Sequence, residues 1–281
     1  MSEKPQKINL DFGDGRVSEI DEHVHTLIID LQNELSTANS TLPFFWDLST
    51  NISSYTETLL GFYSSVLLNR ELSKSQLFQD LFVLFILNEK KNGTFLEFGA
   101  TDGIELSNSF MLEKYFGWTG VLAEPSPQWH SSLYKNRPNT TILTECIYNE
   151  TGKQLDFFVS DRGVLSTLQE FKDSDAKSMP GNTQARNAAG YTCVVNTISL
   201  NDVILKYFNG VQIDYMSVDT EGSELLILEN FNFEKYAPKI VTVEHNFSDQ
   251  QNELDDLLIK NNYRRYFKDF TQFDAWYVRQ E

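Results

Sequence analysis

Acidic side chains stand at the ends of four segments whose apolar residues predict buried strands. They are Glu97 and Asp102 at the first segment, Glu124 at the second, Asp219 and Glu221 at a later one, and Glu244, followed by His245, at the last. The carboxyl ends of parallel strands meet at one edge of an open sheet, and ligands bind there near the point where the strand order reverses. A single Asp or Glu at a loop start is commonly a helix cap. Four equivalent positions predict a ligand site lined by carboxylates.

Residues 95–103 predict a buried strand, a tight turn with two glycines, and the start of a helix. Gly99 and Gly103 would let the backbone approach a ligand where a β-carbon would collide with it. The helix would point its unpaired N–H groups and positive dipole into the same space. The spacing lacks the glycine pattern of a dinucleotide site and the Gly-Lys-Ser/Thr of a phosphate loop. We expect a small charged ligand other than NAD, with Glu124 placed to accept both ribose hydroxyls of a nucleoside.

From residue 94 the pattern alternates between strands and helices, which predicts a parallel sheet with crossover connections. Core strands are expected at 94–99, 120–123, 141–147, 213–218 and 239–243, and helices at 106–115, 128–136, 200–208, after Gly222 and at 249–260. Further extended segments are expected at 155–159, 163–168 and 191–198, and a hairpin of 263–267 with 273–278 closes the sheet. Residues 170–190 are polar without an apolar period, which predicts a mobile loop or a substrate-binding insertion.

The amino-terminal quarter is expected to be a separate helical region, residues 1–73, ahead of an α/β domain at 74–281. Residues 1–20 lack sustained periodicity and predict a loose lead-in. Apolar residues at helical spacing then predict a helix that begins at Asp21, a second from residue 53 or 54, and a third from 73 or 75 to 88. This region would be a lid, a surface for a homodimer, or a packing appendage. We favour packing, because pattern alone is weak ground for a catalytic role.

The charge balance excludes polyanionic partners. Lys and Arg number 23 against 40 Asp and Glu, a formal charge of −17 that repels nucleic acid and anionic lipid. Cys146 and Cys193 are too few for a disulfide framework or a cysteine-rich zinc site. The first residues are polar, unlike a signal peptide, and no later run reaches the roughly 20 apolar residues that a membrane span needs. We therefore expect a soluble cytoplasmic protein with free thiols.

Short motifs along most of the chain resemble one protein family. They are SQLFQD at 75–80, FLEFGATDG at 95–103, SN at 107–108, LAEP at 122–125, SVDTEGSE at 217–224, VEHN at 243–246 and FDAWY at 273–277. Together they resemble the FkbM-type methyltransferases, which are S-adenosylmethionine-dependent O-methyltransferases. The resemblance implies a class I methyltransferase (Rossmann-like) fold: a seven-stranded, mostly parallel sheet with a terminal antiparallel hairpin, here preceded by the helical amino-terminal region.

The resemblance also implies roles for residues at the glycine turn and the neighbouring strand ends. Gly99, Ala100 and Gly103 would carry the methionine half of S-adenosyl-L-methionine, and Glu124 would bind its ribose. Glu97 and Asp102 are also expected at the cofactor. The remaining residues expected at the cofactor are Asn108, Ser126, and Cys146 with Ile147 at the adenine edge, together with Gln79 and Asp80, which would reach the amino-acid end or cap a loop. For Cys146, a small buried hydrophobe is an equally good interpretation.

Asp219, Glu244 and His245 are expected to form the centre that faces the acceptor. Two roles stay open. In one, His245 is a general base that a carboxylate orients. In the other, Asp219 and Glu244, with His245 or Asn246, are ligands of Mg²⁺, Mn²⁺ or Ca²⁺. Two carboxylates exceed what one base needs, which favours the metal. The third interpretation is a His hydrogen-bonded for structure alone.

The family resemblance implies methyl transfer to a hydroxyl of a sugar or glycan precursor, such as one for a surface polysaccharide. Two alternatives are a methyltransferase for a carboxylate, a phosphate or a natural-product hydroxyl, and a scaffold with a vestigial cofactor pocket. The intact set of Glu97, Gly99, Gly103 and Glu124 argues against the scaffold.

Overall fold

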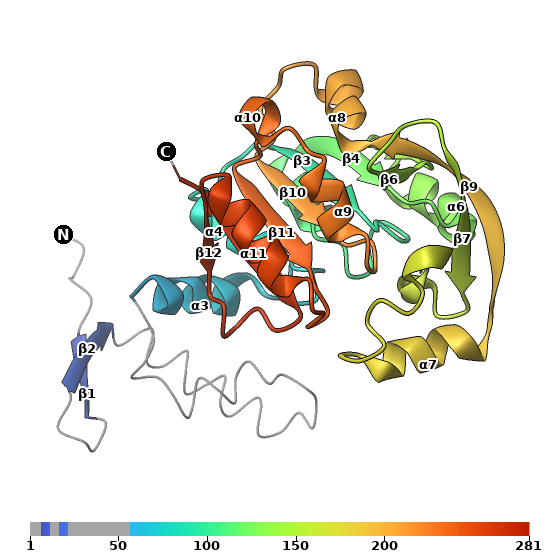
Figure 1. The fold of residues 1–281 in the computed structure, drawn as a ribbon. Helices are drawn as coiled ribbons and strands as arrows, with labels where there is room; N and C mark the ends of the chain where they lie inside the picture. The colour runs from blue at the N-terminus through green and yellow to red at the C-terminus, as the bar shows by residue number, and fades with distance from the viewer. Residues whose placement is uncertain (1–6, 12–16, 22–56, 281) are drawn as a thin grey trace. The chain divides into compact units, whose positions relative to one another are not determined.

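The computed structural model describes residues 7–11, 17–21 and 57–280, and the chain divides into two compact units, residues 1–71 and 72–281 (Figure 1). In the first unit β1 (Lys7–Asp11) and β2 (Val17–Asp21) form an antiparallel hairpin, and α3 spans Glu57–Asn69. The expected loose lead-in at 1–20 is therefore wrong. Strands of five residues are too short to give the sustained periodicity on which that expectation was based. Asp21, expected to begin a helix, ends β2 opposite Lys7. The rest of that expected helix lies outside the described residues.

The second unit is built on a seven-stranded sheet of order β12-β13-β11-β10-β3-β4-β5. Its strands are β3 (Thr94–Phe98), β4 (Thr119–Ala123), β5 (Thr141–Leu143), β10 (Tyr215–Val218), β11 (Ile240–Glu244), β12 (Tyr263–Tyr266) and β13 (Asp274–Arg279). The five strands from β11 to β5 are parallel, and β13 is antiparallel to both of its neighbours. This order is that of the class I methyltransferase fold and confirms the predicted architecture.

Helices cover both faces of this sheet. Helices α9 (Glu224–Glu229) and α11 (Gln251–Lys260) lie on one face, with α10 (Phe233–Tyr236) nearby, and pack on Leu96, Met216 and Val241 (Figure 1). On the other face α4 (Gln79–Ile86) places Phe82 against Trp276, 4.7 Å between ring centroids. The strands are consequently apolar on both sides, as parallel sheets require. Among the described helices none is long and apolar enough to cross a membrane.

A second sheet, of order β6-β9-β7-β8, stands beside the first. Its strands are β6 (Cys146–Tyr148), β7 (Gln154–Ser160), β8 (Thr167–Leu168) and β9 (Gly190–Ser199). The single strand expected at 141–147 is therefore wrong, since β5 pairs with β4 in the first sheet and β6 pairs with β9 in the second. A local apolar pattern does not show which distant strand will supply the hydrogen bonds.

Residues 170–190 are ordered and partly helical, contrary to the expected loop. They contain the end of a 3₁₀ turn at Gln169–Phe171 and the helix α7 (Pro180–Ala188), whose inward face is polar. Asn182, Thr183 and Arg186 of α7 all contact the buried Asp175. A search for apolar residues at helical spacing misses α7, because this helix packs through hydrogen bonds and an ion pair. We call residues 161–190 the insert.

Three further helices differ in extent from the prediction. Helix α5 (Phe110–Phe116) begins later than residue 106, because residues 107–109 fold around Glu97. Helix α4 begins at Gln79, because Phe78 adopts a left-handed backbone, φ 66°, and Ser75 forms a β-bridge with Leu106. The helix expected at 200–208 is α8 (Leu200–Val203) followed by a π-helical turn, Ile204–Phe208. Helix α6 (Pro127–Asn136) agrees with its predicted range to within one residue.

Candidate active site

A cavity of about 210 Å³ opens at the carboxyl ends of the central strands. Its acidic lining residues are Glu97, Glu124, Asp219, Glu221, Glu244 and Asp274, and no lysine, arginine or histidine of the described chain lines it. One end is apolar, with Cys146, Ile147 and Phe157, and the insert contributes Val164, Met179 and Asn182. A cavity therefore lies at the strand ends where the sequence predicted a site, and its wall is rich in carboxyl groups.

The two glycines of the turn make room for the protein rather than for a ligand. At Gly99, φ 70°, a β-carbon would collide with the backbone oxygen of Asp219. At Gly103, φ 80°, it would lie 2.7 Å from side-chain atoms of Leu133 and Arg137. The expected close approach of a ligand is thus not the reason for either glycine. Gly99 still lines the cavity, because the tight turn brings its backbone to the edge of the sheet.

Glu97 organises the loop that follows the turn. Its Oε1 accepts a hydrogen bond from the backbone N–H of Asn108 at 2.7 Å, and its Oε2 accepts from the hydroxyls of Ser107, at 3.0 Å, and Ser109. Burial raises the pKa of Glu97, and the nearby guanidinium of Arg137 opposes that shift. Arg137 also donates to the Gly103 oxygen at 3.0 Å. Glu97 therefore shapes the cofactor side of the cavity by holding this loop.

Glu124 lies at the end of β4 with both carboxylate oxygens facing backbone donors. Oε1 accepts from the N–H of Ser126 at 2.7 Å, and Oε2 accepts from the N–H of Thr101 at 2.8 Å. Burial raises the pKa of Glu124 to about 7, although the two hydrogen bonds act to lower it. Each oxygen keeps a lone pair, because a carboxylate has about four acceptor sites. Two adjacent ligand hydroxyls could bind there.

Not every residue predicted at the cofactor reaches the cavity. Asp80 accepts hydrogen bonds from Ser73 and Lys74, and Asp102 accepts from the N–H groups of Ile104 and Glu105. These two carboxylates close loops, and the lining of the cavity contains neither of them, nor Ala100, Gly103 or Ser126. Gln79 does line it and donates to Asp274 at 2.8 Å. Sequence position alone does not separate a loop-closing carboxylate from one that faces a ligand.

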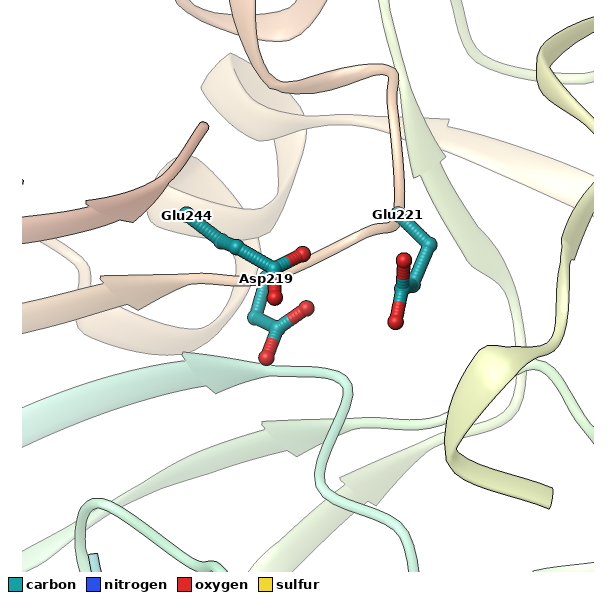
Figure 2. A group of neighbouring side chains, drawn as sticks. All are labelled: Asp219, Glu221 and Glu244. Atoms are coloured by element: carbon teal, nitrogen blue, oxygen red, sulfur yellow. The ribbon is translucent and has the colours of Figure 1, made fainter. Parts of the chain in front are cut away.

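Three carboxylates converge on the opposite side of the cavity. Asp219 follows β10, Glu244 ends β11, and Glu221 lies in the β10–α9 loop; one oxygen from each lies within 4.8 Å of the others (Figure 2). We call these three residues the carboxylate centre. Burial raises the pKa of Asp219 to about 7, and burial with repulsion from Asp219 raises those of Glu221 and Glu244 well above their usual range. The Oε2 atom of Glu244 is buried and has no hydrogen-bond partner among the described residues.

His245 does not belong to this centre. Its Nδ1 accepts from the Phe247 N–H at 3.0 Å, so the ring proton lies on Nε2, which donates to the Asp274 backbone oxygen at 3.1 Å. Burial and the positive charge of Arg265 lower its pKa to about 4. Both ring nitrogens are therefore occupied by backbone groups, as in the structural interpretation. Glu221, an acidic strand-end residue that the predicted centre left out, stands in the place expected for His245.

Residues 97–266 match the family model described as the methyltransferase FkbM domain. The chain belongs to the FkbM methyltransferase family. A comparison with curated protein sequences gave no match. Together with the sheet order, the family makes this chain an S-adenosylmethionine-dependent methyltransferase of class I fold.

Solved methyltransferase structures are similar to this FkbM methyltransferase at low sequence identity. Precorrin-6y C5,15-methyltransferase from Geobacter metallireducens GS-15 is 10% identical with a TM-score of 0.39, over 75% of this chain and 93% of that one. The METTL16 methyltransferase domain is 8% identical with a TM-score of 0.40, over 84% and 91%. The SAH-bound Podospora anserina methyltransferase PaMTH1 is 10% identical with a TM-score of 0.38, over 87% and 100%.

Acceptor atoms and apolar residues that line the cavity of this FkbM methyltransferase fit S-adenosylmethionine. The ribose hydroxyls would donate to Glu124, whose oxygens keep free lone pairs. Asn108 donates to Ser217 at 2.9 Å, and its Oδ1 is buried without a partner among the described residues, so that atom can accept from the ammonium group. Cys146 and Ile147 line an apolar part of the cavity that would receive the adenine. A buried acceptor without a hydrogen-bond partner, such as Asn108 Oδ1, destabilises the protein when the cavity holds no ligand. A hydrogen bond from the cofactor's ammonium group would remove that cost.

Proposed function

We propose that this protein transfers a methyl group from S-adenosylmethionine to a hydroxyl of a sugar or glycan precursor. The observation that carries the proposal is the lining of the cavity, where carboxyl groups gather and no lysine, arginine or histidine of the described chain is present. A phosphate or carboxylate on the acceptor would find no cationic side chain of the described lining to pair with, and burying an anion without such a partner is costly. A neutral polyhydroxylated molecule would instead donate hydrogen bonds to the carboxylates.

The chain's own residues divide the work between two ends of the cavity. Glu124 and Asn108 hold the cofactor, which supplies an electrophilic methyl group when bound. The carboxylate centre of Asp219, Glu221 and Glu244 faces the acceptor and removes the proton from its hydroxyl. Positioning the acceptor oxygen in line with the methyl group supplies much of the acceleration, since proximity can contribute roughly 7–11 kcal/mol.

We further propose that the carboxylate centre binds Mg²⁺, Mn²⁺ or Ca²⁺. Three carboxylates within reach of one point are an oxygen-rich ligand set of the kind these hard cations prefer (Figure 2). A cation held there would offset the cost of burying the three carboxylates and the repulsion of Glu221 and Glu244 by Asp219. It would also lower the pKa of a hydroxyl next to it.

Chelation and readdition of metal test this proposal. The full chain is assayed for transfer of labelled methyl to neutral sugars, amino sugars, sugar phosphates and uronic acids. We expect transfer to the neutral and amino sugars, loss of activity in EDTA, and recovery with one divalent cation. Activity that resists EDTA but depends on Asp219 would make a carboxylate the base instead. Transfer to the anionic acceptors alone would contradict the assignment of the acceptor class.

The thermal stability of the chelated protein should fall as the pH rises from 6 to 8. A carboxyl group with a raised pKa stabilises the fold while it holds its proton, so the stabilisation is full below the unfolded value near 4 and is lost as the pH rises through about 7. The Tm in EDTA is therefore expected to be lower at pH 8. Saturating Mn²⁺ should raise it more at pH 8 than at pH 6, because ligands must be deprotonated.

Glu244→Gln is the matched control for this measurement. It keeps the volume of the side chain and removes one titrating group of the centre, so both the pH dependence and the response to Mn²⁺ should shrink. If the Tm of chelated wild type did not change between pH 6 and 8, deprotonation of the carboxylate centre would not destabilise the protein, contrary to this prediction.

A further inference from the structure

Arg186 of α7 is buried and joins four segments of the chain. Its Nε donates to the Leu165 oxygen at 3.0 Å and its Nη1 donates to the Lys172 oxygen at 3.3 Å. The same Nη1 lies 2.6 Å from Asp175 Oδ1, and Nη2 lies 2.6 Å from Glu221 Oε2. The side chain is 0% exposed. The first three contacts stay inside the insert, whereas the fourth reaches the carboxylate centre.

Glu221 is held by the insert through both its backbone and its side chain. Its backbone oxygen accepts from the Thr167 hydroxyl at 2.9 Å, while its Oε2 accepts from Arg186 and, at 3.3 Å, from Asn246. The residue itself has φ 59°, a left-handed conformation that a non-glycine residue adopts only when its surroundings impose it. Among the described residues, both side-chain donors to Glu221, Arg186 and Asn246, bond to Oε2. Oε1 accepts neither of these bonds and would be available to the carboxylate centre.

We propose that Arg186 is a positioning residue that holds Glu221 in the carboxylate centre and, through the same ion pair, fastens the insert over the acceptor end of the cavity. The positioning of Glu221 for a cation rests on the proposed function. The attachment of the insert by Arg186 does not depend on it. A guanidinium suits this place because its planar fork can serve two carboxylates at once. Residues that hold a metal's carboxylate ligand in place commonly change metal affinity by ten- to a hundredfold when they are replaced.

The cavity lining gives the attachment a consequence for the acceptor. Val164, Met179 and Asn182 of the insert share the cavity with the carboxylate centre. Asn182 is tied to Asp175 at 2.9 Å, and Asp175 is tied to Arg186. Arg186 therefore positions both Glu221, which would act on the acceptor's hydroxyl, and, through Asp175, Asn182, which would contact the acceptor.

Hydrogen exchange tests the attachment without any metal or acceptor. The full chain is compared as wild type, Arg186→Gln, Glu221→Gln and Glu244→Gln, with exchange followed in residues 180–188. We expect Arg186→Gln and Glu221→Gln to speed exchange in α7 roughly tenfold, the scale of one lost charged contact of about 1.4 kcal/mol. Glu244→Gln should leave the exchange of α7 unchanged, because no hydrogen bond or ion pair among the described residues joins Glu244 to the insert. Wild-type exchange of α7 in Glu221→Gln would overturn the attachment, even if Arg186→Gln fails to fold.

Calorimetric titration with Mn²⁺ tests the positioning of Glu221. Arg186→Gln should bind Mn²⁺ roughly tenfold or more weakly than wild type. Asp175→Asn, which loosens the insert while leaving the Glu221 contact in place, should bind it nearly as wild type does. Equal affinity in wild type and Arg186→Gln would overturn the positioning role. A wild type that binds no Mn²⁺ would overturn the cation part of the proposed function and the positioning role with it, while the exchange result would still decide the attachment.

Discussion

Replacing Asp219 with asparagine should lower the rate of methyl transfer by about a hundredfold or more. The change keeps the volume of the side chain and removes its charge, so the centre loses either a ligand or a base, and acid–base assistance alone is worth roughly 10²–10⁴ in rate. The carboxylate follows β10 and faces Glu221 and Glu244 (Figure 2). The assay is turnover of a neutral sugar at saturating S-adenosylmethionine, with cofactor binding measured separately and expected to stay near wild type.

His245→Asn is the matched control for the rate measurement. The ring of His245 bonds two backbone groups, so its replacement should reduce stability with much less effect on the rate. With its pKa lowered to about 4, the ring stays neutral at neutral pH and is a weak base. If His245→Asn abolished transfer while Asp219→Asn retained it, the general base would be His245 and the carboxylate centre would not be the site of proton removal.

Replacing Glu124 with glutamine should weaken S-adenosylmethionine binding roughly ten- to a hundredfold. A charge-assisted hydrogen bond to each ribose hydroxyl is lost or weakened, at a cost of roughly 1.5–3 kcal/mol in all. The same reason predicts that wild-type affinity declines as the pH falls through about 7, where the buried carboxylate takes up a proton. Calorimetric titration of both proteins at several pH values measures the two effects together.

Asp102→Asn is the matched control for cofactor binding. Asp102 was predicted at the cofactor from the same motif, yet its carboxylate accepts from Ile104 and Glu105 inside the turn. Its replacement should leave the dissociation constant near that of wild type. If Glu124→Gln bound S-adenosylmethionine normally and Asp102→Asn did not, the ribose would lie on the turn and not at the end of β4.

The sequence by itself determined the sheet and the places where its chemistry lies. Strands such as β3, β10 and β11 are short apolar runs whose character is local, and parallel packing brings their carboxyl ends to one edge. Glu124, Asp219 and Glu244 follow or end such strands, so their place in the cavity could be predicted without knowledge of any contact. The terminal hairpin of β12 and β13 is local for the same reason.

Tertiary structure decided which side chains face one another. Glu221 belongs to the carboxylate centre and His245 does not, because a left-handed backbone at Glu221 and the insert's Arg186, 35 residues away, turn that carboxylate inward. The helix α7 escaped the pattern because it packs through Asp175 and Arg186, whose pairing has no period in the sequence. Apolar burial repeats along the chain and can be read from it, whereas the partner of a buried charge is chosen by packing between distant segments.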